Sequence, residues 1–231
     1  MAEHVVVRNI KRAPLDVVQA LADAGVATVH EASGRLGLLA PDVRPIQQDV
    51  TISGSAVTVT CAPGDNMMIH AAVEVIQPGD IMMVATTGPT TDGMFGDLLA
   101  TSVIARGGLG LVIDAGVRDT SELRQMGFPV WAAAVHSQGT VKETPGSVNT
   151  PVVCAGQSVD PGDVVVADDD GVVVVPRDQA RAVLEASNTR LDNEEATRER
   201  LEAGELGLDF YGLRDKLVDL GVRWIDSPED K

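Results

Sequence analysis

The sequence predicts an α/β fold: a single compact domain with a mixed sheet, a swivelling-domain-like core and a long C-terminal helix. Three observations support this prediction. The chain of 231 residues has the length of one large domain. Segments with helical spacing alternate with short apolar runs rich in β-branched residues, and such alternation indicates buried parallel strands. Residues 178–205 are highly charged and predict one long helix.

The first elements follow from spacing and from residues that break helices. Pro14 is tolerated at a first helical position, and Gly25 ends the helix that it begins. The sequence predicts further helices over 28–34, 66–75, 96–105 and 118–126, and strands over 50–61, 81–85, 109–113 and 129–135.

The later half repeats a turn. Pro-Gly-Asp at 78–80 and at 161–163 precedes an apolar strand each time, which suggests two corners of one sheet system. A favourable turn sequence that arose twice explains the repeat equally well. Residues 168–171 predict a tight turn into a strand over 172–175, and residues 208–220 predict a last amphipathic segment.

Composition excludes several classes of protein. A hydrophobic fraction of 44% with 23% charged residues excludes a disordered or membrane-embedded chain. The net charge of −16 argues against a general nucleic-acid binder, because an acidic surface repels phosphate. Cys61 and Cys154 have apolar surroundings and predict buried thiols. With no secretory segment and no disulfide framework, the expected location is the cytoplasm.

Common catalytic motifs are missing from the sequence. The four histidines lack the spacing of a zinc site, and there is no serine-nucleophile, phosphate-loop or dinucleotide motif. His70 is expected to be packed or at an interface. A Schiff-base mechanism would have to use Lys142.

The densest polar group lies between residues 93 and 122. Gly96–Leu99 begins a predicted helix, whose N–H groups favour an anion. Arg118 and Asp119 follow the next strand, where α/β sheets bind ligands. Arg118 can bind a carboxylate or enolate oxygen, and Asp119 can bind Mg²⁺. Alternatively, Asp119 is a helix cap and Arg118 its ion-pair partner.

Several strings together resemble one family nearly end to end. They are residues 29–32, 64–70, 96–101, 116–122 and 203–209. The sequence is similar to divalent-metal-dependent pyruvate aldolases that act on 4-hydroxy-4-methyl-2-oxoglutarate and 4-carboxy-4-hydroxy-2-oxoadipate. The regulator of ribonuclease activity A belongs to the same family and shares its fold. The strings at 29–32 and 203–209 resemble the aldolase branch more than the regulator branch.

The resemblance implies how the pyruvyl end of a substrate is held. The main-chain N–H groups of Gly96, Asp97, Leu98 and Leu99 bind its carboxylate. Arg118 contacts the oxygen that becomes the enolate oxygen.

The resemblance also implies a metal site for Mg²⁺ or Mn²⁺. Asp119 is its direct ligand, and waters fill most other positions. Glu31, together with Glu194 or Glu195, holds waters bound to the ion; the adjacent glutamates leave the register open. Asp97 positions or deprotonates the catalytic water.

Thr140 and Lys142, which follow the strand over 129–135, are expected to line the far end of the substrate. The implied reaction is retro-aldol cleavage to pyruvate plus a second 2-oxo acid, pyruvate or oxaloacetate. Oxaloacetate decarboxylation is an expected second activity, and the implied context is the degradation of aromatic compounds.

The resemblance implies a homotrimer or homohexamer with active sites between subunits. We expect one domain over 1–231, whose helical segment of about 177–222 packs on a neighbouring subunit. The expected partner is a small 2-oxo acid, with no nucleic acid and no membrane. The alternative is a non-enzymatic regulator that binds an RNA-processing enzyme, because an acidic trimer complements a basic arm.

Overall fold

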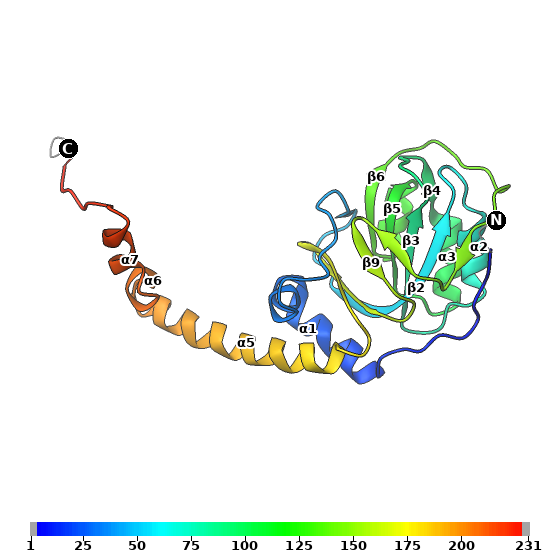
Figure 1. Ribbon diagram of the computed structural model, residues 1–231. Coiled ribbons are helices and arrows are strands. Elements are labelled where there is room, and N and C mark those ends of the chain that lie inside the picture. The colour runs from blue at the N-terminus through cyan, green and yellow to red at the C-terminus, as the bar shows by residue number, and fades with distance from the viewer. Residues whose placement is uncertain (1–3, 228–231) are drawn as a thin grey trace. The chain divides into compact units, whose positions relative to one another are not determined.

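A mixed β-sheet organises the first of the two units into which the chain divides (Figure 1). The computed structural model describes residues 4–227; the first unit ends at Asn188 and the second begins at Thr189. The main strands follow the order β1 (Arg44–Pro45), β6 (Val130–Val135), β5 (Gly110–Val117), β3 (Asp80–Thr86), β2 (Ile52–Cys61), β10 (Val164–Asp168) and β11 (Gly171–Val175).

The middle of this sheet is parallel and its margins are antiparallel. β2, β3, β5 and β6 run parallel to one another, and β4 (Gly93–Phe95) pairs parallel with β5. β1, β7 (Ser147–Val148), β10 and β11 pair antiparallel. The predicted α/β fold with a mixed sheet is confirmed, and the sheet is nearly closed and barrel-like.

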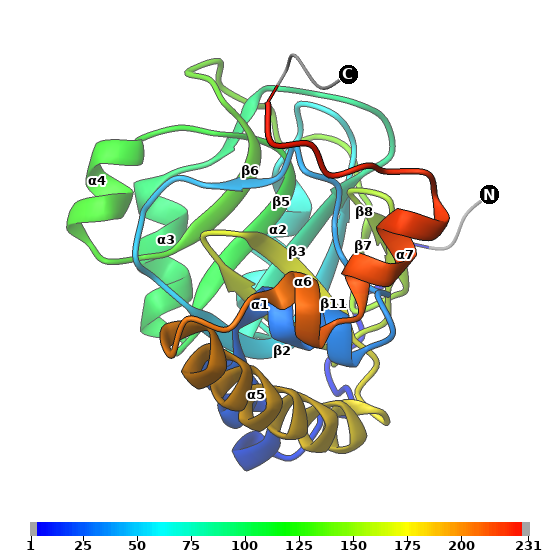
Figure 2. The same ribbon diagram turned by 90° about the vertical axis from the view of Figure 1, so that its left-hand side faces the viewer.

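The helices of the first unit follow the predicted pattern. α1 (Leu15–Ala32) turns at Gly25, whose φ of 74° interrupts the helix where the sequence predicted one helix to end and another to follow. α1 packs against β2, β10 and β11. The shorter helices are α2 (Met67–Val73), α3 (Asp97–Ala105) and α4 (Thr120–Gln125). α3 and α4 lie side by side (Figure 2).

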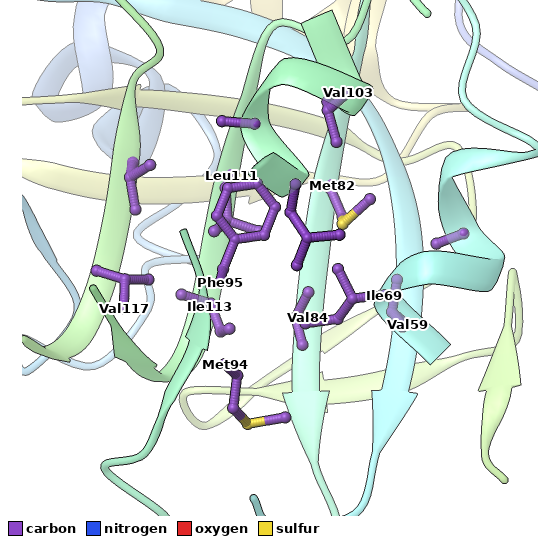
Figure 3. Close-up of a cluster of buried hydrophobic side chains, with 14 of the residues drawn as sticks. Val59, Ile69, Met82, Val84, Met94, Phe95, Val103, Leu111, Ile113 and Val117 are labelled. Carbon is purple, nitrogen blue, oxygen red and sulfur yellow. The ribbon is translucent and has the colours of Figure 1, made fainter. Parts of the chain in front are cut away.

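The strands divide their side chains between two buried clusters because successive residues of a strand point to opposite faces. Met82 and Val84 of β3 belong to one cluster, and Ile81 and Met83 belong to the other. Figure 3 shows the first cluster, where side chains of β3, β4 and β5 meet Ile69 of α2. This packing fixes β4 and β5, which lead to the polar residues described below.

Both cysteines are free and buried, as predicted. Burial raises the pKa of the Cys61 and Cys154 thiols to about 12. Neither thiol is therefore ionised near neutral pH.

The two Pro-Gly-Asp turns lead into β3 and β10, which flank β2 in one sheet. Each turn closes in the same way. The Asp80 carboxylate accepts the Gln77 N–H at 2.8 Å, and the Asp163 carboxylate accepts the Asp160 N–H at 3.0 Å. The two turns are therefore matching corners of one sheet.

Within residues 4–227, five short strands lay outside the predicted elements. They are β1, β4, β7, and the two strands of a separate hairpin, β8 (Val152–Cys154) and β9 (Gln157–Val159). None is longer than three residues, which is too short to show a hydrophobic period.

The long charged helix is confirmed as α5 (Ala180–Glu202), which begins in the first unit and continues into the second. The amphipathic segment predicted over 208–220 forms two short helices. α6 (Gly207–Phe210) and α7 (Leu213–Asp219) are separated at Gly212, whose φ of 66° ends a helix. All residues of α6 and α7 keep substantial exposure within this chain. Packing of this segment on a neighbouring subunit stays a prediction.

Within residues 4–227, every helix is too short or too polar to cross a membrane.

Candidate functional site

A cavity of about 190 Å³ opens beside the carboxyl ends of the parallel strands. The segments that form it follow β2, β4, β5 and β6 in the chain. Carboxyl ends of neighbouring parallel strands share one edge of a sheet, and ligands of α/β proteins bind there. The cavity is lined by Asn66, His70, Gly93, Met94, Phe95, Gly96, Asp97, Leu98, Leu99, Arg118, Asp119, Gly139, Thr140 and Lys142.

The first wall begins at the N-terminus of α3, as the sequence predicted. Gly96 is the N-cap of this helix, and the first N–H groups of a helix lack carbonyl partners within it. The Leu98 N–H donates to the Asp97 carboxylate at 2.8 Å. The Leu99 side chain is buried, whereas Leu98 is 80% exposed at the cavity. A ligand carboxylate here would meet N–H groups and the positive end of the helix dipole.

Arg118 and Asp119 complete this wall at the junction between β5 and α4. The Arg118 N–H donates to the Phe95 carbonyl at 2.9 Å, which ties the junction to β4. Arg118 Nε lies 3.5 Å from Asp119 Oδ2, and both side chains are partly exposed. This ion pair and the N-cap position of Asp119 agree with the structural alternative, but the Asp119 carboxylate makes no capping hydrogen bond to α4 in the structure described.

The Asp119 carboxylate leaves no room for a side chain at position 96, so glycine is required there. A Cβ atom at Gly96 would collide with Asp119 Oδ2 and come within 3.3 Å of the Arg118 side chain. Asp119 itself adopts the left-handed region, with φ of 54° and ψ of 38°, which aspartate tolerates better than most residues. The local backbone thus places one carboxylate against a helix N-terminus that has no side chain at its cap.

The rest of the lining, here called the second wall, comes from α2 and its N-cap Asn66 and from the connection between β6 and β7. Gly139, Thr140 and Lys142 lie in that connection, as the sequence predicted for Thr140 and Lys142. Burial and the positive charge of Lys142 lower the pKa of His70, and both residues line the same cavity. The cavity therefore has cationic groups on both walls, Arg118 and Lys142.

Sequence reasoning did not identify Asn66 and His70 as site residues. His70 is exposed within this chain and lines the cavity, so it is not packed in the core; the alternative, a position at an interface, stays a prediction. Asn66 is buried, and its Nδ2 donates to the Met94 carbonyl at 3.0 Å. Their spacing of four residues places them on the same side of α2, a signal that was present in the sequence.

The residues fit a weakly held divalent ion. No group of three or more His, Cys, Asp or Glu side chains suited to a metal occurs within residues 4–227. Mg²⁺, however, keeps several waters and commonly binds through only one or two carboxylates. Asp119 offers one hard oxygen donor beside an open cavity, which suits such an ion.

Each of the three glutamates implied as outer metal residues forms an ion pair. Glu31, at the end of α1, pairs with Arg35 at 3.1 Å and is not among the residues that line the described cavity. Glu194 pairs with Arg190 at 2.8 Å and Glu195 with Arg198 at 3.3 Å, all in the second unit. Their roles stay predictions.

The chain is similar to known proteins over most of its length. A family profile described as RraA-like, Aldolase/RraA, matches residues 18–174. A Halalkalibacterium halodurans protein named "Putative 4-hydroxy-4-methyl-2-oxoglutarate aldolase" is 28% identical over 87% of this chain and 96% of its own length. A Burkholderia multivorans protein of the same name is 31% identical over 66% of this chain and 94% of its own length.

A solved structure shares the fold. Streptomyces coelicolor RraAS2, described as an unusual member of the RNase ES inhibitor RraA protein family, has a TM-score of 0.75 and 28% identity. The match covers 82% of this chain and 99% of that one. Because the family profile extends from α1 to β11 and includes the strands and helices that form most of the cavity, the chain belongs to the RraA-like family, Aldolase/RraA.

Proposed function

We propose that this protein is a divalent-metal-dependent carbon–carbon lyase. It cleaves 4-hydroxy-4-methyl-2-oxoglutarate or 4-carboxy-4-hydroxy-2-oxoadipate to pyruvate plus a second 2-oxo acid, with oxaloacetate decarboxylation as a second activity. One observation carries the proposal: Arg118, Asp119 and the N-terminus of α3 meet at one cavity. The names of the two aldolase-like relatives support the same reaction class.

The first wall of the cavity suits the pyruvyl end of such a substrate. The N-terminal N–H groups of α3 would bind its carboxylate. Arg118 would donate to the 2-oxo oxygen, on which negative charge grows as the C3–C4 bond breaks. Asp119 would hold Mg²⁺ or Mn²⁺, which stabilises negative charge on that oxygen when bound.

The reaction also needs a base. The C4 hydroxyl loses its proton, its oxygen forms the carbonyl of the leaving 2-oxo acid, and the electrons of the broken bond enter the pyruvate enolate. Asp97 is partly buried and lines the cavity, so its carboxylate is the proposed acceptor of the proton, directly or through a water. Protonation of C3 of the enolate then gives pyruvate.

The second wall suits the other end of the substrate. Lys142 and Thr140 would bind a second carboxylate, and His70 lies near Lys142 at the same cavity. Glu31, with Glu194 or Glu195, would hold waters bound to the metal ion if subunits of a homotrimer or homohexamer share the site. That assembly is part of the proposal.

A coupled assay for pyruvate tests the proposal. Purified protein with 4-hydroxy-4-methyl-2-oxoglutarate should release pyruvate with Mg²⁺, and EDTA should abolish the release. Arg118→Ala should lose activity, whereas Arg8→Ala, which removes an exposed surface pair with Glu74, should keep it. Turnover that persists in EDTA, or a borohydride-trapped adduct on Lys142, would contradict it.

A regulator of an RNA-processing enzyme is the second candidate. The description of the Streptomyces structure and the net charge of −16 favour it. Inhibition of such an enzyme by a protein that releases no pyruvate would support this function. That inhibition should survive Arg118→Ala, because charge docking does not need the cavity.

A further inference from the structure

The turn before α2 contains a buried carboxylate, that of Asp65, which has no role in the proposed reaction. Asp65 is only 2% exposed. Its Oδ1 accepts the Met67 N–H at 2.9 Å, and its Oδ2 accepts the N–H groups of Glu143 and Thr144, both at 2.7 Å. Burial opposes ionisation, but these N–H donors lower the pKa of Asp65 below its usual value. The carboxylate is therefore ionised at neutral pH.

The segment 140–144, which Asp65 contacts, forms part of the cavity. Within it, only Val141 makes a β-bridge, and its bridge partner is Asp65. The Asn66 N–H donates to the Val141 carbonyl at 3.1 Å, and the Val141 N–H donates to the Gly64 carbonyl at 3.0 Å. Residues 140 and 142, on either side of this bridge, line the cavity.

We propose that Asp65 is a positioning residue for the wall of the cavity that carries Thr140 and Lys142. Its carboxylate joins the first turn of α2, which leads to His70, to the two residues that follow Lys142. It thereby holds Lys142 and Thr140 toward the cavity. The chemical class of the ligand rests on the proposed function, but the ordering of segment 140–144 by Asp65 does not depend on that function.

A neutral side chain of the same shape cannot replace this carboxylate. In Asp65→Asn, one oxygen becomes an NH₂ group, which cannot accept the N–H groups that face it. Hydrogen bonds to an ionised acceptor are also about twice as strong as neutral ones. Asp65→Ser offers a second variant, because serine can still accept the N–H two residues later but does not reach Glu143.

The chain offers a matched control in Asp163. This carboxylate is also buried and accepts main-chain N–H groups from two segments, those of Asp160 and Arg177, both at 3.0 Å. It does not line the described cavity. Asp163→Asn therefore makes the same carboxylate-to-amide change beside Ala56, whereas segment 140–144 leads to β7, which pairs with Val59 and Thr60 farther along β2. It also removes an ion pair with Arg177 at 3.6 Å.

Amide hydrogen exchange tests the ordering directly. In Asp65→Asn and Asp65→Ser, the amides of Glu143 and Thr144 should exchange at least ~10-fold faster than in the wild type, because local opening becomes easier. Asp163→Asn should leave them unchanged. Wild-type exchange rates at these amides in both Asp65 variants would overturn the proposal.

A double-mutant cycle with Lys142→Gln tests the effect on the cavity. If Asp65 acts through Lys142, Asp65→Asn should raise KM ~10-fold in the wild-type background with little change in kcat, but less than ~2-fold in Lys142→Gln. An equal rise in both backgrounds would show a merely structural role and overturn the proposal. A wild-type protein without turnover would instead contradict the proposed function, and the exchange measurement alone would then decide the role of Asp65.

Discussion

The two walls of the cavity are built by different means. The junction wall, formed by Gly96–Leu99 with Arg118 and Asp119, lies where strands of the central sheet lead into helices. The loop wall, which is the part of the second wall formed by Gly139, Thr140 and Lys142, lies in a connection held by the buried carboxylate of Asp65. Sheet register fixes the first wall, and a few hydrogen bonds fix the second. We infer that the junction wall provides the chemistry and the loop wall the ligand affinity.

The largest expected effect concerns the junction wall. Arg118→Ala should lower kcat at least ~10²-fold, because Arg118 would stabilise charge that grows in the transition state. Arg118→Lys should restore only part of the rate, since an ammonium group lacks the planar fork. Steady-state pyruvate release measures both. A near-normal kcat in Arg118→Ala would mean that the Arg118–Asp119 pair is only structural.

Replacing one glycine of each wall by alanine compares the rigidity of the two walls. Gly96→Ala should lower activity ~10-fold or more and raise the Mg²⁺ requirement, because its Cβ collides with the Asp119 carboxylate. Gly139→Ala places its Cβ 3.5 Å from Arg118, an ordinary contact, and should be tolerated. Mg²⁺ titrations of activity compare the variants. Equal losses would contradict the difference in rigidity.

Within the junction wall, Asp97 should matter more to one reaction than to the other. Oxaloacetate decarboxylation produces the same pyruvate enolate but requires no proton removal from a hydroxyl group. Asp97→Asn should therefore lower aldol cleavage ~10-fold more than decarboxylation. Asparagine keeps an acceptor for the Leu98 N–H. Equal losses in paired assays would mean that Asp97 supports the α3 N-terminus instead.

The loop wall should show its effect in affinity. Lys142→Gln removes one positive charge that would bind the substrate equally in the ground and transition states. KM should rise ~10-fold while kcat changes little. A steady-state titration with 4-hydroxy-4-methyl-2-oxoglutarate separates the two constants. A loss mainly in kcat would place Lys142 with the catalytic groups.

The smallest expected effect is a pH dependence of stability. The pKa of Asp65 is lowered in the folded protein, so its ionised form stabilises the fold above the unfolded-state pKa of about 3.9. This contribution should disappear as the pH falls below that value and through the folded pKa. Denaturant unfolding should show Asp65→Asn less stable than the wild type by ~1–3 kcal/mol at pH 7. A gap that does not narrow as the pH falls below about 3.9 would contradict this account.

The parts of the site that could be predicted are those formed by residues close together in the sequence. Arg118 and Asp119 are neighbours after a strong apolar strand, and Gly96–Leu99 begins a helix with clear boundaries. Both junctions were therefore placed correctly. The roles carried over to Glu31, Glu194 and Glu195 came from resemblance. Glu31 does not line the described cavity, and Glu194 and Glu195 belong to the second unit.

The α/β class, the long helix and the junction wall could be predicted from the sequence, because hydrophobic period, turns and helix caps act over a few residues. The strand order, in which β3 lies between β2 and β5, could not, because it depends on contacts between distant segments. That order brings α2, with Asn66 and His70, to the cavity formed by the junctions after β4 and β5. It also brings Asp65 to the 140–144 segment, some 78 residues away in the sequence. Such contacts depend on how strands cross and pair, which a local pattern does not specify.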